Sequence, residues 1–492
     1  MQITGKKLHT LIIIVVILII EYFCVSAALP SSNINSMDID TALRMISAVS
    51  AISFIIELIL WKRISNELIS PFIVFFITLY FFCCGQSLGW IFGIKMGERD
   101  LWYRTTYGTT HEVLLKGMCY SMIGITCFFL GAVLQTKLDQ QHTDKKRNQF
   151  AYEDIISAYQ NVGKIMLFIC VPAFVANTFQ TLMIVSTNGY LGIYANAYNS
   201  SPLARILSII ADYYQPCMLI LLLGYKDNPG KRRLILVAML LDVISALYMG
   251  GRSGAFMCVL GILVAYHYFI HQFQKKEVFG MGVTGYLAMA ISNGISLNRA
   301  ESGRSVFDIF TGIFSAHNVI TEFIGELGWN LSSICWTMNL VPQYYPFRYG
   351  MSYLVSLLTF IPSTFFPNGH PIVKWANIGD WLQAALNQTS GPGYTMIAES
   401  YINFGWFGFI ALVIEGYIVS RFIACVPRNK VKENMLSATF QIIIIMTIMK
   451  SLVRASVSAS ARTILFVILP LYILLRMSIK NTTTTTSEKA QK

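Results

Sequence analysis

Residues 8–29 read LHTLIIIVVILIIEYFCVSAAL, a run that is apolar almost throughout. Roughly 20 consecutive apolar residues form a helix long enough to cross the hydrocarbon core of a bilayer. Lipid offers the backbone no hydrogen-bond partner, so a segment of this kind must cross it as an α-helix. The stretch therefore predicts a membrane-spanning helix, and similar stretches recur along most of the chain.

The composition of the whole chain agrees with a membrane protein. Of its 492 residues, 55% are hydrophobic and only 13% are charged, and the mean hydropathy is +0.56. A soluble chain carries about 25% charged residues, so this one cannot cover a soluble core with a polar surface. The composition excludes a cytosolic enzyme, a disulfide-stapled secreted module and a disordered protein.

The predicted fold class is an all-α polytopic membrane protein with about 12 transmembrane helices. The predicted spans are residues 8–29, 45–60, 69–94, 113–134, 161–186, 204–224, 234–249, 254–270, 278–296, 404–424, 435–453 and 463–479. We predict a single transmembrane domain over residues 1–480 and a disordered cytoplasmic tail at 481–492, which is rich in Thr. The first span also resembles a signal peptide, but its length and the Glu21 inside it favour retention.

Clusters of basic residues lie in every second loop between the predicted spans. Lys6 and Lys7 precede the first span, basic clusters follow the second, fourth, sixth, eighth and tenth, and Lys480 follows the twelfth. Cytoplasmic loops carry an excess of Lys and Arg, so both termini are predicted to face the cytoplasm. The same rule explains the formal net charge of +12, which therefore does not indicate a nucleic-acid partner.

Residues 297–403 are predicted to form one large outer loop between the ninth and tenth spans. The loop contains amphipathic stretches at 313–340 and 372–386, a Pro/Gly-rich middle at 362–371, and many Trp and Tyr residues. Such aromatic side chains suit the membrane interface, and they also suit stacking against sugar rings. We predict that the loop folds back on the membrane, and both roles of the aromatic residues stay open.

The predicted outer side carries mostly Arg, whereas the cytoplasmic loops carry mostly Lys. A guanidinium group binds phosphate oxygens through a planar fork and stays charged when partly desolvated. The set therefore predicts an anion site at membrane depth, with a lipid-linked phosphate as its ligand, although any single Arg could instead snorkel or form an ion pair. The candidates are Arg252, Arg299, Arg304, Arg348, Arg454 and Arg462.

Three carboxylates and one histidine on the same side are candidates for acid–base chemistry. Glu322 and Glu326 are four residues apart and share a helical face, and Glu399 lies where the chain re-enters the membrane. A carboxylate there is suited to act as a general base, and the alternative for each is an ion pair with a neighbouring Arg. His370 completes the set. The sequence has no nucleotide-binding loop and no metal-ligand motif, so neither a cofactor nor a metal is predicted.

Short motifs stand out between residues 245 and 425. They are GGRSG at 250–254, EFIGELG at 322–328, VP at 341–342, RYGMSYL at 348–354, IP at 361–362 and GPGYTMIAESYINFG at 391–405. The last motif is the most specific. Through these motifs, its topology and its one large outer loop, the chain resembles the bacterial O-antigen polysaccharide polymerase family, usually called Wzy.

The resemblance implies a GT-C-like, metal-independent glycosyltransferase in the bacterial cytoplasmic (inner) membrane. Such an enzyme joins oligosaccharide repeat units carried on undecaprenyl pyrophosphate, and it moves the growing chain as a block while the lipid pyrophosphate leaves. The arginines would then hold the pyrophosphate. The four titratable candidates, led by Glu399, would act as base or position the acceptor. A chain-length regulator and a flippase are further partners that the resemblance suggests.

Two other functions stay open from the sequence. An O-antigen ligase cleaves the same lipid pyrophosphate linkage but passes the chain to lipid A-core, and the motif around Glu399 favours the polymerase. A transporter or flippase of lipid-linked oligosaccharides also fits about 12 spans with both ends inside. Many such proteins have two similar halves, whereas this sequence shows no convincing internal repeat.

Overall fold

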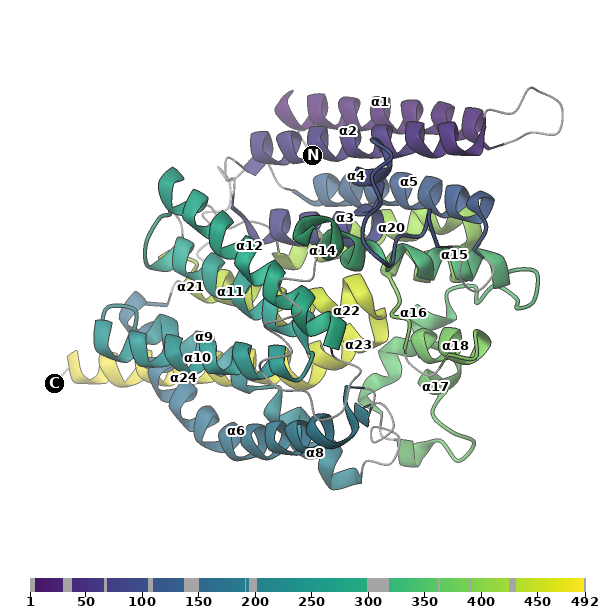
Figure 1. The fold of residues 1–492 in the computed structure, drawn as a ribbon. Helices are drawn as coiled ribbons and strands as arrows, with labels where there is room; N and C mark the ends of the chain where they lie inside the picture. The colour runs from purple at the N-terminus through teal and green to yellow at the C-terminus, as the bar shows by residue number, and fades with distance from the viewer. Residues whose placement is uncertain are drawn as a thin grey trace. The chain divides into compact units, whose positions relative to one another are not determined.

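The computed structural model confirms the all-α class over the part of the chain that it describes (Figure 1). The described residues are 5–29, 38–65, 69–104, 109–136, 150–190, 192–193, 201–298, 318–361, 363–388, 391–423 and 431–490. Within them, every regular element is a helix, and nine helices are long and apolar enough to cross a membrane. This is the pattern of a polytopic membrane protein.

The chain divides into two compact units. Unit 1 comprises Met1–Thr143, Ile320–Cys425 and Ser451–Ala461, and unit 2 comprises Asp144–Val319, Val426–Lys450 and Arg462–Lys492. Each unit is described by itself below. The prediction of a single transmembrane domain stays a prediction.

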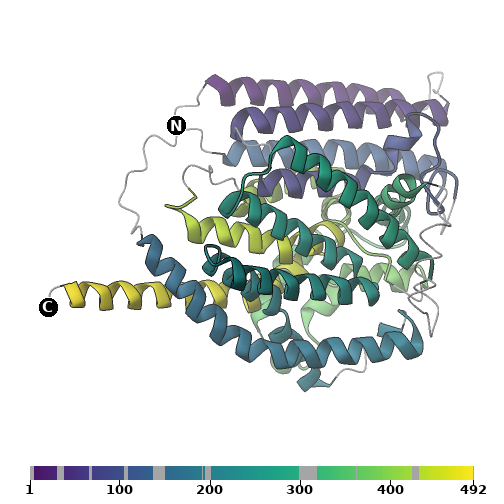
Figure 2. The same cartoon turned by 60° about the vertical axis from the view of Figure 1, so that its left-hand side comes forward.

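Unit 1 is built on long helices that lie side by side in both views (Figures 1 and 2). Helix α5 packs against α1, α2, α15 and α20. The bounds of the long helices are α1 Gly5–Ala28, α2 Ile39–Ser65, α5 His111–Gln135 and α20 Gly408–Ile423. Two glycines allow the closest of these contacts. A Cβ atom at Gly131 of α5 would lie 1.9 Å from the carbonyl oxygen of Val413, and one at Gly416 of α20 would lie 1.9 Å from that of Phe128. Small residues thus let the two backbones touch, as they do between helices in membranes.

The predicted span 69–94 is interrupted in the structure. Helix α3 (Pro71–Cys84) ends before Gln86, and α4 (Ser87–Trp90) is a single turn. The Gln86 side-chain amide donates to the carbonyl oxygen of Gly325 at 2.7 Å and to that of Arg99 at 3.0 Å. A buried amide that bonds to two distant segments stabilises the break, which the apolar run alone does not reveal.

The predicted outer loop (residues 297–403) contains six short α-helices among its described residues, and from Ile320 onward they belong to unit 1. They are α14 (Val319–Gly328), α15 (Leu331–Leu340), α16 (Met351–Ser356), α17 (Pro371–Trp375), α18 (Ile378–Ala385) and α19 (Met396–Phe404). The amphipathic stretch at 372–386 corresponds to α17 and α18, and the stretch at 313–340 corresponds to α14 and α15 from residue 318 onward. Whether the loop contacts the membrane surface stays a prediction.

Among the described residues, unit 2 contains eight α-helices that lie wholly within it (Figures 1 and 2). They are α6 (Tyr152–Asn188), α8 (Pro202–Ala211), α9 (Tyr214–Gly224), α10 (Pro229–Tyr248), α11 (Arg252–Phe269), α12 (Lys275–Asn298), α21 (Met435–Thr447) and α24 (Leu469–Ala490). Helix α9 packs against α6, α10, α11 and α21. Helix α24 continues through Ala490, into the segment that the sequence predicts to be disordered.

The number of spans stays a prediction. Each predicted span corresponds to a helix or a pair of helices. The helices at 69–94, 234–249 and 278–296, which are α3, α10 and α12, are not among the nine that meet the criteria of length and hydropathy. The GT-C-like arrangement and the cytoplasmic position of both termini also stay predictions.

Candidate active site

Glu399 joins three segments of unit 1 that are far apart in the sequence. Its side chain lies in α19 and is completely buried, with an exposed fraction of 0%. The Ser352 hydroxyl of α16 donates to one carboxyl oxygen at 2.7 Å, and the backbone N–H of Val457 donates to the other at 2.9 Å. Each carboxyl oxygen therefore has a donor, so Glu399 is well placed to hold the surrounding segments in position.

Local sequence explains why α19 begins and ends where it does. Thr395 caps its N-terminus, because the Thr395 hydroxyl accepts a hydrogen bond from the backbone N–H of Ala398 at 3.1 Å. Gly405 ends the helix with a φ of +59°, a conformation that favours glycine. The motif at 391–405 thus contains both the start and the stop signal of the helix that carries Glu399.

The turn Arg348-Tyr349-Gly350 pairs with the last turn of α19. The backbone N–H groups of Arg348 and Tyr349 donate to the carbonyl oxygens of Ile402 and Asn403 at 2.9 and 3.0 Å. Gly350, with a φ of +82°, donates to the Asn403 side chain at 3.0 Å. Carbonyl groups at a helix C-terminus lack partners within the helix, and the turn satisfies them. The motifs at 348–354 and 391–405 therefore pair with each other through hydrogen bonds.

Arg348 lies within the predicted outer loop, and its side chain is buried, with an exposed fraction of 7%. Its guanidinium group donates to the carbonyl oxygen of Trp375 and lies 5.1 Å from the centre of the Trp381 ring. Burial lowers the pKa of this group, whereas the nearby Tyr394 and Glu399 act to raise it. Arg348 is thus a buried cation that interacts with both the loop and the cluster around Glu399.

Arg454 lies beside the same cluster, at the end of α22 (Met449–Arg454) and just before α23 (Val457–Thr463). Its carbonyl oxygen accepts a hydrogen bond from the backbone N–H of Tyr394 at 3.1 Å. A Cβ atom at Gly393, where φ is +79°, would lie 3.6 Å from the Cγ atom of Arg454 and 3.0 Å from the Asn330 side-chain oxygen. The positive φ and the close approach of Asn330 favour glycine here, and the arginine side chain lies at ordinary contact distance from it. Arg454 as a whole is half-buried, and its guanidinium group has no hydrogen-bond or ion-pair partner among the described residues.

Of the other four candidate arginines, two lie in unit 2 and two lie outside the described residues. Arg252 is the first residue of α11 in unit 2, directly after Gly250, which has a φ of +86°, and Gly251. Arg462 is exposed and lies in the last turn of α23, where unit 2 resumes. Arg299 and Arg304 lie outside the described residues. A pyrophosphate-binding role for these four residues stays a prediction.

Glu322 and Glu326 fasten α14 to the loop that follows α4. Glu322 accepts a hydrogen bond from the backbone N–H of Glu98 at 3.3 Å, and Glu326 lies 3.9 Å from the guanidinium group of Arg99. Gly325 lets the two backbones touch, because a Cβ atom there would lie 1.8 Å from the carbonyl oxygen of Met96. The two carboxylates share a helical face, as the spacing predicts, and their contacts to this loop include the alternative ion pair with an arginine.

His370 caps the N-terminus of α17. Its Nδ1 atom accepts a hydrogen bond from the backbone N–H of Ile372 at 3.1 Å, so its Nε2–H donates to the carbonyl oxygen of Ile361 at 3.0 Å. Both ring nitrogens are thus occupied by backbone groups of the outer loop. The catalytic role of His370, like those of Glu322 and Glu326, stays a prediction.

Several residues of the cluster were not among the predicted site residues. Ser352, Tyr394 and Asn403 all lie inside the motifs at 348–354 and 391–405, so those motifs contained the signal. The contribution of Val457 comes from its backbone N–H, which leaves no signal in the residue type. Within the described ranges, no group of three or more His, Cys, Asp or Glu side chains is arranged to hold a metal ion.

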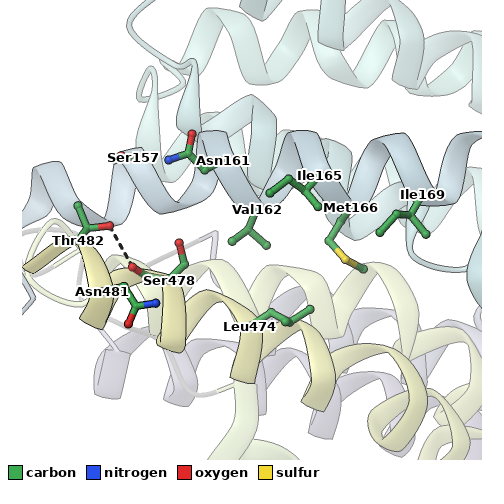
Figure 3. A pocket seen from close by; sticks show the side chains of 10 residues that line it. All are labelled: Ser157, Asn161, Val162, Ile165, Met166, Ile169, Leu474, Ser478, Asn481 and Thr482. Atoms are coloured by element: carbon green, nitrogen blue, oxygen red, sulfur yellow. Dashed lines mark hydrogen bonds between the residues drawn. The ribbon is translucent and has the colours of Figure 1, made fainter. Parts of the chain in front are cut away.

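A groove of about 830 Å³ lies in unit 2 between α6 and α24 (Figure 3). One end is lined by apolar side chains and the other by uncharged polar ones. The lining residues are Ser157, Asn161, Val162, Ile165, Met166, Ile169, Leu474, Ser478, Asn481 and Thr482. At the polar end, the Thr482 hydroxyl donates to the carbonyl oxygen of Ser478, four residues earlier on the same helix, at 2.9 Å. None of the lining residues is a predicted site residue.

Comparison with known families adds one finding to this geometry. A family model described as O-antigen polysaccharide polymerase Wzy matches residues 9–486. Comparisons with curated proteins and with solved structures gave no match.

Proposed function

This chain belongs to the O-antigen polysaccharide polymerase Wzy family, and we propose that it joins undecaprenyl-pyrophosphate-linked repeat units at the outer face of the bacterial cytoplasmic membrane. Membership of the family, together with the apolar helices, makes it a multi-pass membrane polymerase of glycosyltransferase type that acts on lipid-linked oligosaccharide repeat units. The reaction and the roles of individual residues below are our proposal.

The proposed reaction is a block transfer. A hydroxyl oxygen of the acceptor unit forms a bond to the anomeric carbon of the growing chain, and the bond from that carbon to the lipid pyrophosphate breaks. The pyrophosphate leaves with the electron pair, and the acceptor hydroxyl gives its proton to a base. Because negative charge develops on the pyrophosphate, fixed cations that face it lower the barrier.

The observation that supports this proposal best is the half-buried Arg454 next to a well-ordered cluster of buried polar groups. Its guanidinium group has no partner in the described part of the chain, and its planar fork of donors matches the oxygens of a phosphate. The hydrogen bond from the backbone N–H of Tyr394 holds the Arg454 backbone, and its side chain runs past Gly393 at contact distance. We assign the pyrophosphate contact to Arg454 first.

Arg348 and Glu399 are proposed as positioning residues in this site. Both oxygens of Glu399 accept hydrogen bonds and its exposed fraction is 0%, which favours positioning over proton abstraction. The Val457 N–H that donates to Glu399 belongs to the first residue of α23, three residues after Arg454. The carboxylate therefore helps to hold the segment that positions this arginine. Arg348 connects the same cluster to α17 and α18 of the outer loop.

The other candidates keep secondary places in the proposal. Arg252, Arg299, Arg304 and Arg462 are proposed as further contacts to the pyrophosphates of donor and acceptor. Glu322, Glu326 and His370 are proposed only for acceptor positioning, since their observed contacts hold the outer loop together. Metal independence and the partnership with a chain-length regulator and a flippase are also proposals.

A deletion experiment in a strain with a repeating surface glycan tests the proposed function. Loss of a polymerase leaves a single repeat unit on lipid A-core, whereas loss of a ligase removes all attached glycan. Loss of a flippase leaves lipid-linked units on the cytoplasmic side. We expect the first result, with restoration of the long chains by the wild-type gene. Either of the other results would reject the polymerase role.

A further inference from the structure

Unit 1 contains a second pair of buried acidic side chains, away from the outer loop. Glu21 lies in α1 and Glu57 in α2, and both helices are long and apolar enough to cross a membrane. Both side chains have an exposed fraction of 0%. The two carboxyl groups are close enough to interact electrostatically. The proposed reaction uses neither of them.

The partners of these two carboxyl groups are few and uncharged. The Thr126 hydroxyl of α5 donates to one oxygen of Glu21 at 2.9 Å. The second oxygen of Glu21 and both oxygens of Glu57 form no hydrogen bond of normal geometry in the part of the chain that the structure describes, although the Ser53 and Thr126 hydroxyls lie nearby. Over the same residues, no Lys or Arg forms an ion pair with either group. The groups that interact with the pair are Thr126, Ser53, Tyr80, Cys24, Cys84 and Cys127.

Tyr80 of α3 provides a second, independent observation. Its side chain has an exposed fraction of 1%, and its hydroxyl group forms no hydrogen bond of normal geometry among the described residues, although the Ser50 and Ser87 hydroxyls lie nearby. The hydroxyl interacts electrostatically with Glu57. The pair is therefore surrounded by helices α1, α2, α3 and α5, and polar atoms from several of them lack the hydrogen bonds that buried polar atoms normally form.

Protonation of the Glu21 and Glu57 carboxyl groups would explain why their oxygens have so few hydrogen-bond donors nearby. An ionised carboxyl group that is buried without a counter-charge or donors is strongly disfavoured. A protonated carboxyl group is neutral, and it brings its own O–H donor. Two protons would therefore remove both charges and supply two donors to three acceptor oxygens that now form no hydrogen bond of normal geometry.

We propose that Glu21 and Glu57 form an intramembrane proton-binding site, in which each carboxyl group carries a proton at neutral pH. The two O–H groups hydrogen-bond across the pair and, with Thr126, connect α1 and α2 to α5. The site is separate from the cluster around Glu399 and does not depend on the proposed function. A monovalent metal cation held by the same oxygens is the competing occupant, and the experiment below distinguishes the two.

Infrared spectroscopy of the purified full-length protein in lipid nanodiscs tests the proposal. Protonated carboxyl groups give a carbonyl band that is separate from that of carboxylates and that shifts in D₂O. We expect E21Q and E57Q each to lose part of this band at neutral pH, while E277Q, which removes an exposed carboxylate, leaves it unchanged. A band that is unchanged in both E21Q and E57Q would overturn the proposal, because the two groups would then be ionised.

Thermal unfolding of the same samples distinguishes protons from a metal cation. A Gln side chain is neutral and has the shape of a protonated Glu, so E57Q is expected to unfold close to the wild-type temperature. Replacing sodium or potassium chloride by choline chloride is expected to change nothing. A melting temperature that rises with sodium or potassium in the wild type, but not in E57Q, would assign the site to a metal cation and reject the proposal. If E21Q does not fold, E57Q alone tests the assignment: loss of part of the infrared band supports the proposal, and an unchanged band rejects it.

Discussion

Two acidic sites in unit 1 are equally buried and yet differ in their surroundings. At Glu399 each carboxyl oxygen has a hydrogen-bond donor, and the buried Arg348 guanidinium is nearby. At Glu21 and Glu57, three of the carboxyl oxygens form no hydrogen bond of normal geometry among the described residues, and the neighbouring groups are uncharged. Burial alone therefore does not assign a role to an acidic residue. The partners indicate that the carboxyl group at one site holds neighbouring segments together, whereas the pair at the other site is suited to neutral acids.

The difference follows from where the two sites lie in the fold. Glu399 lies where a loop and several helix ends meet, and helix ends have free backbone N–H groups such as that of Val457. Glu21 and Glu57 lie within long helices, whose backbone N–H groups are already bonded inside the helix. A carboxyl group there has only side chains as partners, and α5 supplies the single hydroxyl of Thr126.

The largest effect in this comparison is expected from E399A. Removing the carboxyl group leaves the Ser352 hydroxyl and the Val457 N–H without an acceptor, and each orphaned buried donor costs about 1–3 kcal/mol. We expect a clear drop in the thermal unfolding temperature together with loss of polymer. E57Q, a change at the other acidic site, should leave the unfolding temperature and the amount of polymer near those of the wild type. Equal stability of E399A and wild type would show that Glu399 does not hold the cluster together.

The next effect is expected from R454K, which keeps the charge but loses the planar fork. Loss of a charge-assisted hydrogen bond of about 1.5–3 kcal/mol would slow transfer by about 10- to 100-fold. The unfolding temperature should not change, because the guanidinium has no partner in the described structure. R348K is the matched control, since it loses contacts to Trp375 and Trp381 and should lower both stability and activity. Wild-type rates for R454K would remove Arg454 from the pyrophosphate contact.

A smaller effect on polymer length is expected from R252K in unit 2. The guanidinium fork is lost while the charge remains, so the variant should make shorter glycan chains at a normal protein level. Gel analysis of the surface glycan measures this, with immunoblotting as the control for protein amount. Chains of full length would leave Arg252 without a role in binding the leaving group.

The smallest effect is expected from E326Q. The Arg99 side chain, which lies 3.9 Å from Glu326, is 42% exposed, and such an ion pair contributes only about 0.2–1 kcal/mol. We expect a slight drop in the unfolding temperature and a normal distribution of chain lengths. A strong loss of polymer with unchanged stability would instead return Glu326 to the acid–base candidates.

The sequence predicts the helices well, because each apolar run satisfies its own backbone whatever surrounds it. It does not predict the break at Gln86, since that depends on hydrogen bonds to Gly325 and Arg99, which are remote in the sequence or outside the run. The run at 69–94 therefore looks like one span although α3 ends at Cys84.

The candidate site was predictable in part for a similar reason. The motifs at 348–354 and 391–405 contain Arg348 and Glu399, and the structure shows that these motifs pair through backbone hydrogen bonds. The contacts from Glu399 to Ser352 and Val457 join positions about 50–60 residues apart. Such contacts depend on tertiary packing. Residue types alone therefore could not separate Arg454, whose guanidinium group lacks a described partner, from Arg348, whose guanidinium group contacts Trp375 and Trp381.

The most direct test of the central claim is lengthening of lipid-linked repeat units by the purified protein in nanodiscs. Undecaprenyl-pyrophosphate-linked units would be supplied without nucleotide sugar, with and without a chelator, and the products separated by length. We predict a ladder of lengthened chains with the wild type, much slower lengthening with R454K, and lengthening near the wild-type rate with E57Q. Absence of lengthening by folded wild type, or a full ladder at the wild-type rate from R454K, would contradict the proposed grip of a guanidinium group on the departing pyrophosphate.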